Sequence, residues 1–157
     1  MSNAQVAAGV AFYIGDSAPG TYDKAGYEAV TWSKVGEISN ISGDVGKVFN
    51  LATYQLLEDR GIVKRKGGYN NGSISVEYAY HRSDTGQADM VTAVDSDDPL
   101  PFRIVLTDDD TTYVYLMGQV MGTPINIGGT EDFITSTVPI EIDSVSDVLF
   151  EDADASP

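Results

Sequence analysis

The most regular pattern in the chain is a strict alternation of apolar and polar residues between positions 72 and 81. A period of two is the pattern of a β-strand, because successive side chains of a strand point to opposite faces. We therefore predict a strand here, with one face in the core and the other in water. The apolar face would carry Ile74, Val76, Tyr78 and Tyr80.

Similar patterns elsewhere predict the rest of a mainly β protein. Apolar or alternating runs bounded by Gly, Pro and Asp predict strands at 7–14, 28–33, 102–106, 111–121, 133–142 and, more briefly, 145–150. The acidic run at 108–110 predicts the turn of a hairpin. Pro139 predicts a sheet edge or a bulge, because proline has no N–H to donate to a neighbouring strand.

One helix is predicted, at about 84–95. Asp84 is a favourable N-cap residue, and Gln87 stands three positions later, which is the spacing of a capping box. An acidic run ending in proline then makes continuation of the helix unfavourable. The predicted apolar stripe of this helix consists of Ala88, Val91 and Val94.

Between 54 and 71 the apolar pattern breaks down, which predicts a long exposed loop. This segment holds four of the nine basic residues, namely Arg60, Lys64, Arg65 and Lys66. In a chain of net charge −15, these charges fit an acidic patch on another copy of the same chain. The alternative is a loop that is simply solvated.

The length of 157 residues fits one domain spanning 1–157. Several strands with one helix placed mid-sequence predict an antiparallel β-sandwich or open barrel with the helix on its flank. The segment 151–157 is predicted to be an acidic, flexible C-terminal tail.

The net charge of −15 argues against a protein that grips nucleic acid, because an acidic surface repels phosphate and anionic lipid. The same acidity also serves solubility. Apolar runs such as 6–14 are shorter than the roughly 20 residues that a membrane span requires. The absence of cysteine excludes disulfides and thiolate chemistry.

Residues that suggest catalysis or ligand binding are few. His81 is the single histidine, which together with the absence of cysteine argues against a closed zinc site. The acidic runs at 95–98 and 108–110 lack the Gly and Glu spacing of an EF-hand. No Gly-x-Ser-x-Gly elbow is present. We expect no catalytic residue, no metal, no cofactor and no enzyme activity.

The order of these elements resembles that of the tail tube proteins of long-tailed bacteriophages, the siphophages. The resemblance covers roughly residues 8–143 and rests on order and spacing. Its parts are an N-terminal strand, Trp-Ser-Lys-Val-Gly-Glu-Ile at 32–38, the long loop, the 72–81 strand, Asp-Thr-Gly-Gln at 84–87 and the hairpin that begins at Phe102. The tube protein of type VI secretion systems is related to that family in fold.

The resemblance implies a structural virion protein that self-assembles into stacked hexameric rings, forming a tail tube through which DNA passes during ejection. The implied partners are copies of itself and the tape measure, terminator and tail tip proteins, with no specific DNA binding and no membrane. The implied location is the virion tail, after assembly in the host bacterial cytoplasm.

The resemblance also suggests site residues. The 54–71 loop, with Arg60, Lys64, Arg65 and Lys66, would contact the next ring. Acids on polar strand faces are candidates for the wall of the lumen, where they would repel DNA; these are Glu77, Glu141 and Asp143.

Other functions fit the sequence as well. One is a secretion tube subunit or a tail terminator that caps the tube. Another is a carbohydrate- or protein-binding β-sandwich, which the nine tyrosines would suit. A hydrolase that uses paired carboxylates ranks last, because no pair of acids stands out.

Overall fold

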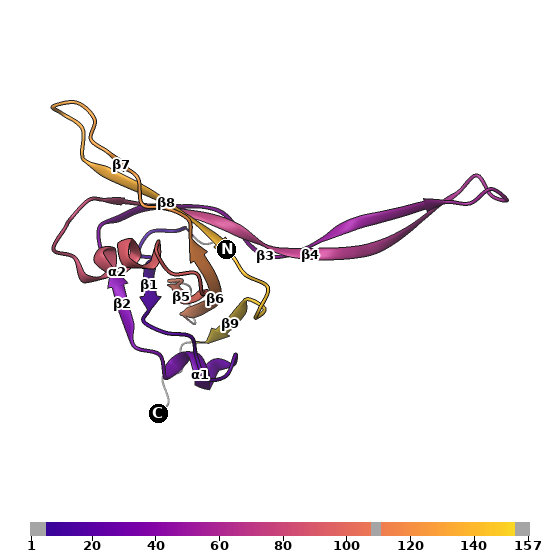
Figure 1. The fold of residues 1–157 in the computed structure, drawn as a ribbon, viewed down its shortest axis with the longest axis horizontal. Helices are drawn as coiled ribbons and strands as arrows, with labels where there is room; N and C mark the ends of the chain where they lie inside the picture. The colour runs from indigo at the N-terminus through magenta and orange to yellow at the C-terminus, as the bar shows by residue number, and fades with distance from the viewer. Residues whose placement is uncertain (1–5, 108–110, 153–157) are drawn as a thin grey trace, which may run out of the picture.

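The structure of the protein, a computed structural model, describes residues 6–107 and 111–152 (Figure 1). The helices of this part are α1 (Lys24–Glu28) and α2 (Thr85–Ala93). The strands are β1 (Ala11–Gly15), β2 (Trp32–Val35), β3 (Ile38–Gln55), β4 (Ile62–Ala79), β5 (Leu100–Val105), β6 (Thr112–Val120), β7 (Ile125–Asn126), β8 (Thr135–Ile142) and β9 (Leu149–Asp152). The turn predicted at 108–110 and residues 153–157 of the predicted tail lie outside the described residues, whereas Glu151 and Asp152, predicted as part of that flexible tail, belong to β9 and pair with β6.

The strands form one antiparallel sheet in the order β2-β1-β5-β6-β8-β4-β3, with β7 added to β8 and β9 added to β6. The sheet does not close, since β2 and β3 lie at its two ends. This arrangement confirms the predicted mainly β fold with an open antiparallel sheet and a flanking helix. The predicted hairpin of the 102–106 and 111–121 segments is confirmed as the β5–β6 pair.

The core lies between the curved sheet and α2. Its fully buried side chains come from several strands and from the helix, and include Phe12, Val76, Met90, Phe102 and Leu116, each 0% exposed. Along β4 the predicted alternation is confirmed for Ile74, Val76 and Tyr78, which are buried. Tyr80 lies beyond the end of β4 and is 39% exposed.

Pro139 lies in β8 at a point where the pairing of that strand with β6 has ended and its pairing with β7 has not begun, which agrees with the predicted edge or bulge. β8 lies between β4 and β6. The Pro139 carbonyl accepts a hydrogen bond from the N–H of Met121, so the backbone nitrogen of Pro139 faces the same side, toward β6. The β6–β8 ladder has already ended there, at the Val120–Ile140 pair. Proline is therefore tolerated because no strand requires its missing N–H.

The helix α2 begins as predicted but buries a different face. The Asp84 carboxylate caps the helix by accepting the Gln87 N–H at 3.0 Å. The residues that face the core are Gly86, Gln87, Met90 and Ala93. Two of the three predicted stripe residues do not face the core, because Val91 is 50% exposed and Ala88 is also exposed, whereas Val94 packs against the core. A Cβ at Gly86 would meet the Lys34 carbonyl oxygen at 2.1 Å, so the helix packs here directly on the backbone of β2.

The helix α1 was not predicted, and the strand expected at 28–33 is replaced by this helix and the shorter β2. Asp23 caps α1 by accepting the Gly26 N–H at 2.8 Å. Tyr27 of α1 stacks on Tyr115 of β6, with ring centroids 4.9 Å apart, and Met117 completes this second small core. The hydrogen bond to Gly26 lowers the pKa of the Asp23 carboxyl below its usual value.

The long loop predicted at 54–71 is instead part of a two-stranded β ribbon, and this correction changes the outline of the molecule. β3 and β4 are 18 residues each and pair from Ile38–Tyr78 out to Gln55–Ile62. Only residues 56–61 form the turn. The distal part of the pair projects far from the body (Figure 1). The segment is exposed, as predicted, but it is ordered by strand pairing.

Candidate assembly surfaces

The distal part of the β3–β4 pair, residues 45–72, is named here the ribbon. Cross-strand partners in an antiparallel pair lie on the same face, so the register Leu51–Lys66, Thr53–Lys64 and Gln55–Ile62 defines one face. That face combines exposed apolar side chains with lysines, since Leu51 is 66% exposed and Ile62 is 54% exposed. Burial of such side chains requires a partner outside the chain.

The four predicted contact residues all lie on the ribbon. Arg60 is in the turn, whereas Lys64, Arg65 and Lys66 are on β4. Because side chains alternate along a strand, Lys64 and Lys66 share the face defined above, while Arg65 lies on the other face beside Ala52. The structure thus places the basic residues along one projecting element.

The ribbon bends where it leaves the sheet. Three glycines with positive φ lie at the bend: Gly43 at 101°, Gly46 at 142° and Gly72 at 99°. A Cβ at Gly72 would meet the Asp44 carbonyl oxygen at 2.3 Å, so no other residue fits there without a shift of backbone. The strand register also slips between Val45 and Val48, which is the signature of a β-bulge.

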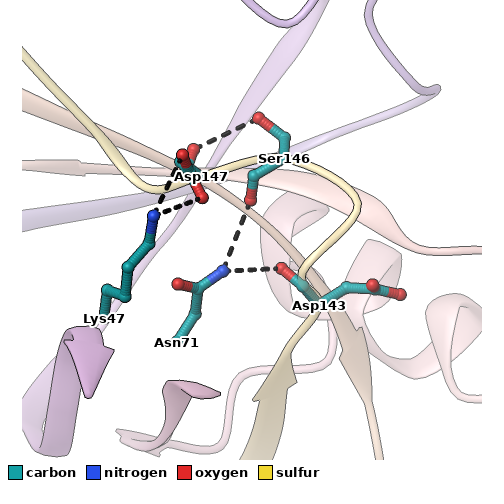
Figure 2. A network of polar contacts seen from close by, with 5 residues as sticks. All are labelled: Lys47, Asn71, Asp143, Ser146 and Asp147. Carbon is teal, nitrogen blue, oxygen red and sulfur yellow. Dashed lines mark hydrogen bonds and ion pairs between the residues drawn. The ribbon is translucent and has the colours of Figure 1, made fainter. Parts of the chain in front are cut away.

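A polar network fixes the ribbon at this bend, as Figure 2 shows. Asn71, which is 1% exposed, donates its Nδ2 to the Asp143 carbonyl at 3.2 Å and to the Ser146 carbonyl at 3.5 Å. Lys47 forms an ion pair with Asp147 at 3.4 Å. These contacts join the root of the ribbon to the segment after β8. These contacts were not predicted from the sequence, because Asn71 lies in the segment 54–71 that was predicted to be an exposed loop.

Two of the three predicted lumen acids lie on one continuous polar face of the sheet. Glu77 of β4 and Glu141 of β8 share this face. Ser73 of β4 pairs with Glu141, and Ser73 points to the same side of the strand as Glu77, which is four residues further along. Asp44 of β3, which the sequence analysis missed, pairs with Ser73 from the other side. The residues of this polar face are Asn40, Ser42, Asp44, Ser73, Ser75, Glu77, Thr137, Pro139 and Glu141.

The polar face holds acids and no basic residue. Asp44 and Glu141 lie in one row across three strands and are about 10 Å apart, from two strand spacings. Glu77 accepts hydrogen bonds from the hydroxyls of Ser39, at 3.1 Å, and Thr137, at 3.5 Å. These bonds hold its carboxylate on the surface of the sheet, so the face is negative and ordered.

Asp143 lies apart from the other two acids. It follows the end of β8, is half-buried, and uses its carboxylate to accept the Val145 N–H at 2.9 Å. Its backbone N–H donates to the Met117 carbonyl at 2.7 Å. Asp143 therefore shapes the turn that receives Asn71, and its contribution to the polar face is smaller than that of Glu77 or Glu141.

Nothing in residues 6–107 and 111–152 groups three His, Asp or Glu side chains into a metal site. His81 is exposed, and its backbone N–H donates to Gln87. Across the same ranges, no helix has the length and apolar character needed to cross a membrane. The surfaces that stand out are therefore the ribbon and the polar face.

Comparisons with known proteins identify the fold of this chain. No family model and no curated protein matches the chain. The sheath-tube complex of PVC, an extracellular contractile injection system, in its extended state, is 10% identical, with a TM-score of 0.68 over 98% of this chain and 95% of that chain. The tail of an empty GTA particle with C6 symmetry is 12% identical, with a TM-score of 0.63 over 94% and 98%.

The SPP1 tail tube is 14% identical, with a TM-score of 0.58 over 91% of this chain and 76% of that chain. At these identities the similarity establishes the fold, and the fold is that of tail tube proteins, as the order of elements predicted. These three chains come from a sheath-tube complex, a tail and a tail tube.

Proposed function

We propose that this chain is the tube subunit of a phage or phage-like tail, and that its copies assemble into stacked hexameric rings around a bore. The observation that carries this proposal is the shared fold with tube assemblies over more than nine-tenths of the chain. The C6 symmetry of the GTA tail supports six copies per ring.

The unfinished sheet supports assembly independently. β3 is the end strand of the sheet, with β4 as its neighbour in the described part of the chain. A strand of 18 residues with an unpaired edge is a template for pairing with another chain. Pairing between copies would turn six open sheets into one closed wall.

The polar face lines the bore in this proposal. Duplex DNA carries one negative charge per about 1.7 Å of helix axis, so a wall bearing Asp44, Glu77 and Glu141 repels it and lets it slide. The ribbon, with Arg60, Lys64, Arg65 and Lys66, contacts the neighbouring ring. Terminator, tape measure and tail tip proteins are the other partners, in a virion tail assembled in the host cytoplasm.

Negative-stain microscopy of the purified protein at increasing concentration tests the proposal. Stacked rings or tubes with a central hole are the expected result. Isolated rings that never stack would favour a terminator. A monomer at every concentration would contradict the proposal and favour a binding module.

The lumen assignment has its own test. Replacing Glu77 and Glu141 by Lys in the particle is expected to leave tubes intact and to slow DNA ejection, because the wall then attracts phosphate. Thr31→Lys, an exposed change outside the polar face, is the control for added charge. Ejection at the wild-type rate in the double variant would contradict the assignment.

A further inference from the structure

A second projection extends from the body at the opposite end of the molecule's long axis from the ribbon tip (Figure 1). Residues 121–136 form a hairpin in which Ile125 of β7 pairs with Ser136 of β8. This hairpin, named here the β7–β8 hairpin, exposes large apolar side chains: Phe133 is 82% exposed and Ile127 is 69% exposed. The strands predicted at 111–121 and 133–142 leave this hairpin unpredicted.

The charge of the β7–β8 hairpin is negative. Glu131 and Asp132 are both exposed near its tip. No Lys or Arg follows Arg103 in the whole sequence, so no basic side chain of the hairpin neutralises them. The hairpin therefore offers an apolar surface with acidic groups at its rim.

The ribbon has the complementary composition. It contains five of the nine basic residues of the chain and two of the 24 acidic ones. On the face defined above, Leu51 and Ile62 are exposed next to Lys64 and Lys66. The ribbon is thus an apolar surface with basic groups at its rim, in a protein whose net charge is −15.

We propose that the β7–β8 hairpin of one copy docks on the ribbon of another copy. The hairpin and the ribbon project from opposite ends of one chain, so they meet only between copies (Figure 1). Two different surfaces of the same chain that meet in this way form a heterologous contact, which repeats from copy to copy and builds rings or stacks.

The two parts of the contact have different roles. Burial of Phe133 and Ile127 against Leu51 and Ile62 supplies the attraction. The opposite charges set the orientation and speed the encounter. This inference rests on the proposed tube function. It adds to that proposal the surface of the neighbouring copy that the ribbon contacts.

A charge exchange tests the pairing. Lys64→Glu with Lys66→Glu, and separately Thr130→Lys with Glu131→Lys, are each expected to raise the protein concentration needed for assembly about tenfold. Asp132 is left unchanged, because its carboxylate accepts the Gly129 N–H at 3.0 Å and holds the turn. Light scattering against concentration gives the readout.

The combined variant decides the question. With both exchanges in one chain the charges are again opposite, and assembly is expected to return close to the wild-type concentration. Lys34→Glu is the matched control, since Lys34 is exposed on β2 away from both surfaces. If the combined variant assembles worse than either exchange alone, the pairing is wrong, although tubes formed by the wild type would still support the proposed function.

Cross-linking tests the contact even in the absence of tubes. The chain has no cysteine, so Thr53→Cys on the ribbon and Thr130→Cys on the hairpin place one thiol in each of two differently sized tagged copies. A bismaleimide is expected to join the two different copies more than either copy to itself. Equal amounts of all three products, or none, would overturn the inference; mixed dimers without tubes would uphold it and contradict the ring proposal.

Discussion

Gln87→Ala is expected to be among the most destabilising single changes in this protein. The side chain is 3% exposed and uses both of its polar atoms. Its Nε2 donates to the carbonyls of Gly36 and Ala79, each at 3.0 Å, and its Oε1 accepts the His81 N–H at 2.8 Å. Gly36 comes directly after β2, and Ala79 is the last residue of β4. Gln87 therefore joins two strands that are not neighbours in the sheet.

The expected magnitude follows from the three lost bonds. Each is worth about 1 kcal/mol net, and the carbonyls and N–H left without partners add a desolvation cost. We expect the free energy of unfolding to fall by roughly 3–5 kcal/mol. The gain in helix propensity from Ala is only about 0.5 kcal/mol. Against a typical total of about 5–15 kcal/mol, this loss is large.

Equilibrium urea unfolding measures the effect, with Gln55→Ala as the control. Gln55 is an exposed glutamine at the end of β3, and its replacement is expected to change stability by less than about 0.5 kcal/mol. Gln87→Leu fills most of the same volume and should be as destabilising as Gln87→Ala. A loss below about 1 kcal/mol in both variants would refute the view that Gln87 fastens the sheet.

Three other changes test separate features. Asn71→Ala should cost about 1–3 kcal/mol and raise hydrogen exchange at the root of the ribbon; unchanged exchange would show that the network of Figure 2 does not hold it. Gly72→Ala should destabilise the protein more than Gly46→Ala, because a Cβ at position 72 meets backbone atoms and a Cβ at position 46 does not. Equal effects of the two changes in thermal unfolding would contradict this. Burial raises the pKa of Tyr27, Tyr78 and Tyr115 above the usual 10.0. Folding favours the neutral form of these three tyrosines, so their burial contributes fully to the free energy of unfolding below pH 10.0, and this contribution is lost as the pH rises above 10.0. Full tyrosinate absorbance while the protein is still folded would contradict this.

The elements with a buried and a wet face could be predicted from the sequence. Ile74, Val76 and Tyr78 alternate with polar residues because the core lies on one side of β4 only. The same holds for Val138 and Ile140 of β8. The β5–β6 hairpin was predicted for the same reason, since burial imposes the period of two.

The ribbon could not be predicted because, beyond its root at Val45 and Asn71, neither of its faces is buried within the chain. Without burial there is no apolar period, and pairs such as Gly67 and Gly68 look like turns. The ribbon is ordered by the hydrogen bonds between β3 and β4. The register of this pairing cannot be read from the pattern of apolar residues. Asp44 was missed on the same ground, because only its pairing with Ser73 places it beside Glu141.

The helix α2 shows how a correct cap can accompany a wrong face. The Asp84 cap was predicted, but a capping box also requires the N3 side chain to bond the N-cap backbone N–H. Here Gln87 reaches instead to the strands, and the N–H of Asp84 donates to the His81 carbonyl at 3.0 Å. The core-facing side of the helix consists of Gly86, Gln87, Met90 and Ala93, so a stripe chosen through Ala88 and Val91 indicated the wrong side.

The most direct test of the account is a cryo-EM reconstruction of the assembled protein. We predict stacked sixfold rings in which Asp44, Glu77 and Glu141 face the bore and each ribbon lies against the β7–β8 hairpin of a neighbouring copy. A tube whose bore is lined by other residues, or a chain that stays monomeric with its ribbon in solvent, would contradict it.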